Sequence, residues 1–275
     1  MKKIDHSRIL ITLILIVLAI LWIFPIYIVA LNSVKTLGEI FSSPLNMPKS
    51  IQFQNYIEAW KITGYPGKFL NSLIVTVSSI LLITVCGSMA GYKLSRSRTR
   101  LSKIIFLVFV SCMLIPFHVV MIPLVKIARD ANLVNNLLGL SLIYTGMQSS
   151  FAIFLYHGFV KTIPTELDEA AKVDGCSAFG TFWRIIFPLL GNITLTIIIL
   201  SVLYIWNDFL MPLLLLQNDD VKTLPVTAYS FISRYARDYT RQLPAVVLCA
   251  IPVIIFYVFV QKYVTKGIIQ GSVKG

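Results

Sequence analysis

Residues 164–188 read PTELDEAAKVDGCSAFGTFWRIIFP, the only long stretch between two apolar runs with the pattern of folded soluble structure. Pro164 and Thr165 predict a helix start, and Asp168 closes a weak capping box with the threonine. Gly175 predicts the end of this helix, because glycine readily adopts the left-handed conformation. A helix of about two turns is too short to be stable alone. We therefore expect it to pack against its own chain or to dock in a partner's groove.

The two sides of this helix differ in chemistry. Leu167, Ala170 and Ala171 recur at helical spacing and give one small apolar side. The first turn carries three carboxylates, which the positive end of the helix dipole stabilises: Glu166, Asp168 and Glu169. Ser177 predicts the start of a second helix with an apolar stripe made of Phe179, Phe182, Trp183 and Ile186. This pattern favours a docking element presented beside a membrane.

Composition predicts an all-α, integral membrane protein. The chain has 275 residues, of which 57% are hydrophobic and only 13% charged. A helix needs about 20 apolar residues to cross the hydrocarbon core. Runs of that kind predict six transmembrane helices at 10–31, 69–92, 104–124, 138–160, 189–213 and 243–261. Pro116 and Pro123 predict a kink in the third of them, and Gly87 with Gly91 predicts close helix packing in the second.

Lysine and arginine density predicts the orientation. With both termini on one side, that side holds the denser positive charge and should be cytoplasmic. Most of the signal comes from one loop that contains Lys93, Arg96, Arg98, Arg100 and Lys103. The segment 164–188 then faces the cytoplasm. The formal net charge of +12 is explained by topology and by contact with anionic membrane lipid, so nucleic-acid binding is not needed to account for it.

Polar residues within the spans are candidates for a solute path. Tyr144 and Gln148 lie on the polar fourth span, while Trp206, Asn207 and Asp208 lie at the end of the fifth. Asp208 is the one acidic residue inside a predicted span, which makes it a candidate functional group. It could equally be a satisfied interfacial carboxylate or a cap after a broken helix. Trp206 could stack on a sugar or anchor the helix at the interface.

Several classes of site are missing from the sequence. It contains no phosphate-binding loop, so if transport is driven by ATP another chain must hydrolyse it, and we expect no cofactor on this one. The sequence shows none of the motifs that would indicate an enzyme, such as a metal-ligand spacing, a nucleophile elbow or paired intramembrane carboxylates. An ion-coupled secondary carrier remains an alternative, although such carriers usually place several ionisable groups near the midplane.

The residues Glu169-Ala170-Ala171, followed at fixed spacing by Gly175, Ile185 and Pro188, resemble the EAA loop of ABC importer permeases. Phe187 stands where that motif has leucine. More of the chain resembles the MalG-like second permease subunit of maltose-type carbohydrate importers, in the segments 55–56, 71–73, 91–96, 163–164, 174–175, 206–209 and 271–275. The resemblance covers nearly the whole length and implies the type I ABC importer permease fold.

The resemblance implies a function and a set of sites. It implies an N-terminal span with an external segment (1–68), a permease domain (69–264) that contains the coupling loop 161–188, and a cytoplasmic tail (265–275). It implies that the chain couples to an ATPase through Glu169, Ala170, Ala171, Asp174, Gly175, Pro188, Gly271, Lys274 and Gly275.

The implied system is a binding-protein-dependent sugar importer of the bacterial cell membrane that works by alternating access. Its expected partners are a homologous second permease, a dimer of ATP-binding subunits and an extracytoplasmic sugar-binding protein, with an oligosaccharide as substrate. An ABC permease for a non-sugar solute is the alternative within this class.

Overall fold

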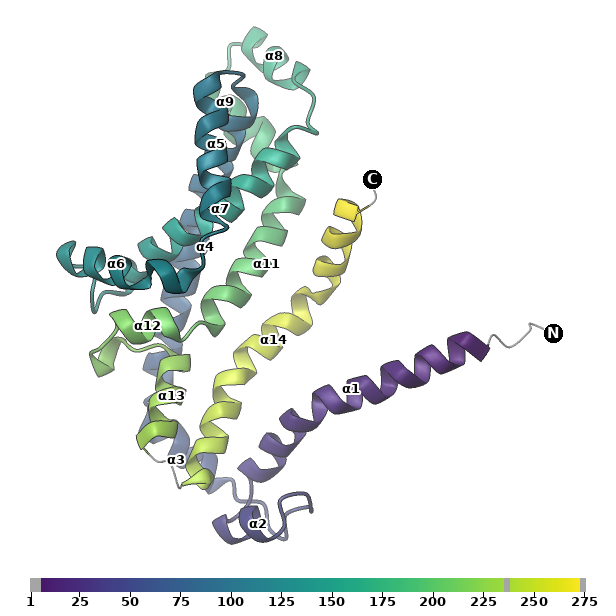
Figure 1. The fold of residues 1–275 in the computed structure, drawn as a ribbon, viewed down its shortest axis with the longest axis vertical. Coiled ribbons are helices and arrows are strands. Elements are labelled where there is room, and N and C mark those ends of the chain that lie inside the picture. The colour runs from purple at the N-terminus through teal and green to yellow at the C-terminus, as the bar shows by residue number, and fades with distance from the viewer. Residues whose placement is uncertain (1–5, 235–237, 273–275) are drawn as a thin grey trace. The chain divides into compact units, whose positions relative to one another are not determined.

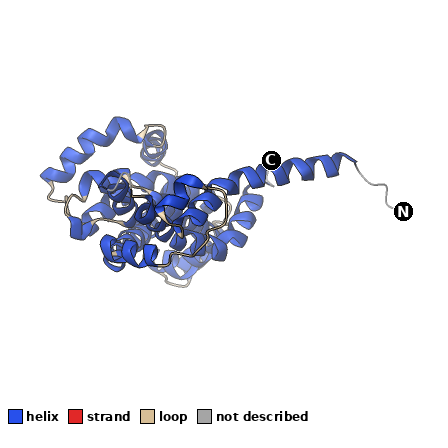
Figure 2. Ribbon diagram, turned by 90° about the horizontal axis from the view of Figure 1, so that it is seen from below, coloured by secondary structure: helices blue, strands red, loops and turns tan. Residues whose placement is uncertain are grey.

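The computed structural model describes residues 6–234 and 238–272, and the regular elements of that part of the chain are all helical (Figure 1). Coloured by secondary structure, the described chain shows helices and loops without a strand (Figure 2). The principal helices are α1 (His6–Ser33), α2 (Leu37–Ser42), α3 (Gln54–Thr63), α4 (Tyr65–Arg96), α5 (Arg100–Cys112), α6 (Phe117–Asp130), α7 (Leu137–Val160), α8 (Glu166–Val173), α9 (Ala178–Thr181), α10 (Phe187–Leu189), α11 (Gly191–Asn207), α12 (Leu210–Leu215), α13 (Leu224–Arg234) and α14 (Tyr239–Ser272).

Four of these helices are long and apolar enough to cross a membrane, namely α1, α4, α7 and α14. Two further pairs of helices meet that test only as bent pairs, which brings the number of candidate spans to six. The first, second, fourth and sixth predicted spans fall on α1, α4, α7 and α14. The third and fifth predicted spans are not straight helices.

The third predicted span, 104–124, consists of α5 and α6, whose axes differ by 104°. Helix α5 ends at Cys112, and Pro116 caps α6 in an extended conformation. Proline has no N–H to continue the helical hydrogen bonds, so the ladder stops before it. The prediction of a kink is confirmed, and its size makes α6 a separate element that diverges from α5 (Figure 1).

The fifth predicted span, 189–213, is interrupted at both ends. Helix α11 meets the preceding helical segment, Ala178–Leu189, at an angle of 76°. Its last helical residue is Asn207, since Asp208 adopts an extended conformation before α12 begins. Upstream, residues Phe182–Ile186 form a π-helical turn that ends two residues before Pro188. The wider turn leaves room for the proline ring, which would clash in a regular α-helix.

The chain divides into two compact units. The first contains Met1–Tyr65 and Thr227–Pro252. In it, α3 contacts the beginning of α14 through Ala59 and Ala245, and Glu58 on α3 forms a 3.1 Å ion pair with Arg241. These contacts connect two parts of the first unit that are distant in sequence.

The first unit also contains a lysine with no exposed surface. The Lys35 ammonium donates hydrogen bonds to the side-chain oxygen of Asn32 at 3.1 Å and to the carbonyls of Ser43 and Pro44 at 3.0 and 3.1 Å. Asn55 donates to the carbonyl of Lys35 at 2.9 Å. Because a buried ammonium needs acceptors for its donors, this cluster fixes the segment between α1 and α3.

The second unit contains Pro66–Val226 and Val253–Gly275. Its apolar core includes Val75, Ile83, Leu140, Tyr144, Tyr156, Ile186, Ile197, Met211 and Leu215. Helices α4 and α7 approach closely at Gly87 and Gly91. A β-carbon at Gly87 would lie 2.8 Å from the β-carbon of Ala152, and one at Gly91 would lie 2.6 Å from that of Tyr156. The predicted packing role of this glycine pair is confirmed.

Candidate functional site

The segment 164–188 folds as a short helix followed by a bent one. Helix α8 ends in a Schellman motif, in which the N–H of Cys176 donates to the carbonyl of Ala171 at 2.9 Å and that of Gly175 to Lys172 at 3.0 Å. Gly175 has a φ of +77°, so the prediction that it ends the helix in the left-handed conformation is confirmed. Ser177 begins the next helix as expected, because its hydroxyl accepts a hydrogen bond from the N–H of Gly180 at 3.1 Å.

The predicted capping box at the start of α8 is wrong. Thr165 has helical backbone angles and makes no side-chain cap. The carboxylate of Asp168 contacts α4 instead. It forms an ion pair with Arg96 at 2.8 Å, and one of its oxygens accepts a hydrogen bond from the hydroxyl of Tyr92. Thr165 is the nearest possible partner in sequence, but in the fold the buried Asp168 carboxylate pairs with α4 instead.

The residues of α8 that are buried differ from the predicted apolar side of this helix. The inward residues are Asp168 and Ala171, which are 7% and 2% exposed. Leu167 and Val173 are 37% and 88% exposed, and Ala170 is exposed as well. The predicted small apolar side of α8 is therefore split: Ala171 faces inward, while Leu167 and Ala170 face outward. The outward surface of α8 combines apolar and charged side chains.

The other predicted coupling residues have different positions. Glu169, Asp174 and Gly175 are exposed, and Asp174 with Gly175 borders a hollow of about 550 Å³ that also includes Phe179 and Trp183. Pro188 is exposed in α10. Gly271 lies in the last turn of α14, within the part of the tail that is helical. Lys274 and Gly275 lie outside the described residues.

Of the five predicted solute-path residues, the structure joins two. The hydroxyl of Tyr144 on α7 donates to a carboxylate oxygen of Asp208 at 2.7 Å. The other oxygen of Asp208 accepts a hydrogen bond from the N–H of Leu210, the first residue of α12, at 2.9 Å. Tyr144 is completely buried. Asp208 thus follows the end of α11, and its carboxylate is hydrogen-bonded both to the start of α12 and to the fourth span.

The remaining three solute-path candidates are separate from this pair. Trp206 is 8% exposed and its ring packs edge-on against Phe69, with centroids 5.7 Å apart. Asn207 is exposed, and its side-chain amide donates to the carbonyl of Leu203 at 2.7 Å. Gln148 is half-buried on α7. In this structure Trp206 therefore does not offer an open ring face for stacking.

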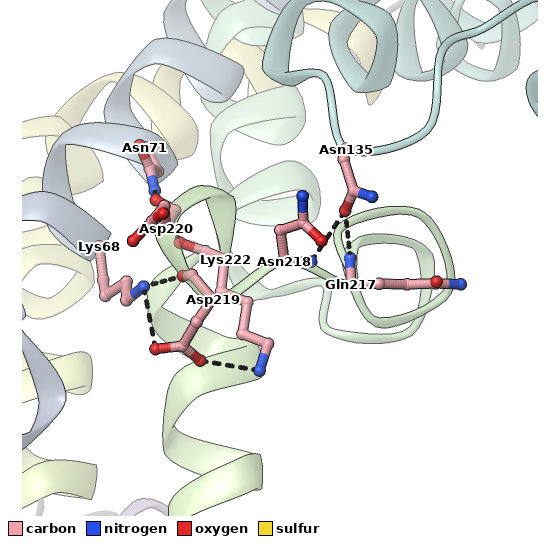
Figure 3. A network of polar contacts seen from close by, with 8 residues as sticks. All are labelled: Lys68, Asn71, Asn135, Gln217, Asn218, Asp219, Asp220 and Lys222. Carbon is pink, nitrogen blue, oxygen red and sulfur yellow. Dashed lines mark hydrogen bonds and ion pairs between the residues drawn. The ribbon is translucent and has the colours of Figure 1, made fainter.

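A polar network after α12 was not predicted (Figure 3). The ammonium of Lys68 at the start of α4 lies 3.7 Å from the carboxylate of Asp219 and donates to its backbone carbonyl. Asn71 donates to the carbonyls of Asp220 and Lys222 at 2.7 and 3.0 Å. These contacts hold the 217–224 loop against α4.

The same loop is held from a second direction. A side-chain oxygen of Asn135 accepts the N–H groups of Gln217 and Asn218 at 2.7 and 2.9 Å (Figure 3). Asn135 itself has a φ of +56°, a conformation that asparagine adopts more readily than most residues. The asparagine at 135 and the acidic pair at 219–220 are sequence signals for this network. Neither identifies its partner.

Comparison with known proteins places the chain among transport proteins. Residues 83–270 match the model of the family described as binding-protein-dependent transport system inner membrane component. The probable starch degradation products transport system permease protein AmyC of Thermoanaerobacterium thermosulfurigenes is 41% identical over 274 residues, which cover 100% of both chains. The melibiose/raffinose/stachyose import permease protein MelC of Bacillus subtilis (strain 168) is 37% identical, over 97% of this chain and 96% of MelC.

A further relative agrees with this placement, and a solved structure shares the fold. The arabinooligosaccharides transport system permease protein AraQ of Bacillus subtilis (strain 168) is 34% identical, over 98% of this chain and 96% of AraQ. A chain of a bacterial ABC transporter involved in the import of the acidic polysaccharide alginate has the same fold, with a TM-score of 0.84, 22% identity and coverage of 96% of this chain and 98% of that one. The chain therefore belongs to the family of binding-protein-dependent transport system inner membrane components.

Proposed function

We propose that this chain is a permease subunit of an ATP-driven importer of oligosaccharides. The observation that carries the proposal is 41% identity along the full length to a permease for starch degradation products. Relatives of lower identity are named for melibiose, raffinose and stachyose, and for arabinooligosaccharides. These sugars differ in linkage and in monosaccharide, so the proposed substrate class is the oligosaccharide rather than one sugar.

The partners of the proposed complex are inferred from a motif that the sequence lacks and from the charge of one of its loops. The sequence has no phosphate-binding loop, so ATP and Mg²⁺ would be held by a dimer of separate ATP-binding subunits. A second, homologous permease would complete the translocation path, and an extracytoplasmic sugar-binding protein would deliver the solute. The positive loop at 93–103 supports a cytoplasmic location for both termini and for segment 164–188.

Segment 164–188 is the proposed contact with the ATPase. Its outward surface presents the Glu169 carboxylate beside the small side chain of Ala170, and a β-carbon added at Gly175 would meet no atom within 4 Å. Small residues allow a close approach of a partner, and the carboxylate can pair with a basic side chain. Pro188 and the tail residues Gly271, Lys274 and Gly275 are secondary members of this proposed contact.

The solute path is proposed to run along the side of α7 and the break after α11. Tyr144 and Asp208 join these two elements at a 2.7 Å hydrogen bond, while Gln148 and Asn207 are the more accessible polar side chains near them in sequence. A broken helix at this position supports alternating access, because its two parts can move as separate rigid bodies. Trp206 stays a candidate only if its packing on Phe69 changes between states.

Uptake by the reconstituted complex tests the proposed function. The chain, its partner permease, the ATP-binding subunits and the sugar-binding protein are placed in vesicles and given maltotriose, raffinose or arabinotriose. We expect ATP-dependent accumulation of at least one of these sugars, with dependence on the binding protein. Accumulation driven by an ion gradient without ATP, or of non-sugar solutes alone, would contradict the proposal.

A further inference from the structure

One arginine at the end of α4 holds the chain on both sides of the entry to α8. The guanidinium of Arg96 pairs with the carboxylate of Asp168 at 2.8 Å. It also donates to the carbonyl of Val160, the last residue of α7, at 3.4 Å and to that of Pro164 at 3.3 Å. A planar guanidinium with five donors suits such divergent acceptors, whereas a lysine ammonium does not. Arg96 thus fixes where the chain leaves α7 and where it enters α8.

Tyr92, one turn earlier on α4, contacts the segment at two places, Asp168 and Phe182. Its hydroxyl donates to Asp168, while its ring lies 5.3 Å from the ring of Phe182 in the helix that follows α8. Phe182 is 3% exposed and belongs to the core of the second unit. The last turns of α4 therefore contact the segment before, within and after α8.

The ion pair between Arg96 and Asp168 is largely shielded from solvent. The side chains of Arg96 and Asp168 are 17% and 11% exposed, so solvent screens their attraction less than it would at the surface. Removing one partner would leave the other charge poorly solvated, which is the costly way to break such a pair. Glu169, the neighbouring carboxylate, is exposed, so adjacent acidic residues face in opposite directions.

We propose that the Arg96–Asp168 pair, with the Tyr92 hydroxyl, is the link that passes movement of α8 to α4. This inference rests on the proposed function, since α8 moves only if an ATPase moves it. Arg96 is a positioning residue: it makes α8 and the end of α4 move as one body. Helix α4 has 32 residues, a length of about 48 Å at 1.5 Å per residue. Displacement of its end can thus reach the other face of the membrane.

The same helix carries the loop network at its other end. Lys68 and Asn71 hold residues 219–222 near the start of α4 (Figure 3). A displacement applied at Arg96 would therefore act on a helix that also positions this loop. Both sets of contacts lie in the second unit.

The test measures sugar accumulated per ATP hydrolysed by the reconstituted complex. The variants are Arg96→Ala, Asp168→Asn and the charge swap Arg96→Asp with Asp168→Arg. Arg98→Ala is the matched control, because Arg98 is an exposed arginine two residues away for which the described chain provides no ion pair. Assembly is followed by co-purification of the ATP-binding subunits, and thermal stability is measured for each complex.

We expect Arg96→Ala and Asp168→Asn to assemble and hydrolyse ATP while sugar accumulated per ATP falls by about tenfold. The charge swap should recover part of that ratio, and Arg98→Ala should match the native chain. A ratio within about twofold of native for Asp168→Asn, which preserves the side-chain shape, would overturn the proposal. So would an equal loss of stability and assembly in the single variants and the swap with an unchanged ratio, since that is the result of a purely structural role.

Failure of the proposed function looks different. If the native complex accumulates no sugar with ATP, the oligosaccharide importer is wrong whatever the Arg96 variants do. If the native complex works and the variants keep the native ratio, only the link through Arg96 is wrong.

Discussion

The hydroxyl of Tyr144 on α7 is hydrogen-bonded at 2.7 Å to the carboxylate of Asp208, the residue at which α11 breaks. The bond joins the fourth predicted span to the end of the fifth. Because Asp208 follows the last residue of α11 and also accepts the N–H of Leu210 in α12, one carboxylate connects three helices. Substitutions at this point can therefore distinguish a structural role of the Asp208 side chain from a role of its negative charge.

Asp208→Asn tests the charge, because an amide oxygen can still accept from Leu210 and the amide can pair with Tyr144. If the carboxylate serves the solute path, sugar uptake by the reconstituted complex falls while the free energy of unfolding stays close to native. Tyr144→Phe removes the buried donor instead, and we expect a loss of about 1–3 kcal/mol in stability. Unfolding in detergent and uptake are measured for both variants. Native uptake by Asp208→Asn would assign the carboxylate a structural role only.

Gly91→Ala is expected to destabilise the packing of α4 on α7 by about 1–3 kcal/mol. The new β-carbon would lie 2.6 Å from the β-carbon of Tyr156 and 3.0 Å from the backbone nitrogen of His157. Backbone atoms cannot move aside cheaply, so the helices must separate. Thermal unfolding of the purified chain in detergent measures the change.

Gly158→Ala is the matched control for that substitution. Gly158 lies on α7, where an added β-carbon would meet no atom within 4 Å. The alanine should be neutral or stabilising by up to about 1 kcal/mol, the usual gain of alanine over glycine in a helix. Equal effects of Gly91→Ala and Gly158→Ala would contradict the role of close packing.

Gly175→Ala should destabilise the turn after α8 by about 1–2 kcal/mol. The cause is backbone strain alone, because φ is +77° and no atom lies within 4 Å of the added carbon. Gly175→Asn should cost less, since asparagine tolerates this conformation. Hydrogen exchange of the 164–188 segment, measured by mass spectrometry, should rise more for alanine than for asparagine. Identical exchange in both variants would argue against a strained turn.

The hydrogen bonds of Glu39 predict that the stability of the segment between α1 and α3 depends on pH. Its carboxylate accepts the N–H of Lys49 at 2.9 Å and that of Thr36 at 3.3 Å, and these bonds hold the pKa of Glu39 below its ordinary value. Because the folded pKa is lowered, the stabilisation is present above the unfolded pKa and disappears as the pH falls through the folded pKa. Hydrogen exchange of residues 36–49 should therefore increase at low pH in the native chain. Glu39→Gln should lack this step, and an identical pH profile in both would contradict the account.

The sequence was sufficient for features that depend on local pattern. Four spans follow from continuous apolar runs, as α1, α4, α7 and α14 show. Gly175 follows from the chemistry of helix ends, and the close approach at Gly87 and Gly91 follows from small residues one turn apart. Each of these features depends on properties of residues that lie near one another in the chain.

Features that depend on distant partners could not be predicted. Asp168 was assigned to a local capping box because nothing in the sequence identifies Arg96 and Tyr92 as its partners. The hydropathy of 104–124 is continuous across Pro116, so composition cannot distinguish a kinked span from a bend of 104°. The loop held by Lys68, Asn71 and Asn135 likewise exists only once three separate segments have come together.

The most direct test of the account is ATP hydrolysis by the reconstituted complex with Glu169→Lys in this chain. Lys103→Glu, an exposed charge reversal in the first turn of α5 and outside the coupling loop, is the control. If exposed Glu169 docks on the ATP-binding subunits, Glu169→Lys loses co-purification or lowers sugar-stimulated hydrolysis by about tenfold, while the control stays native. Native assembly and stimulation in Glu169→Lys would contradict the coupling role of segment 164–188.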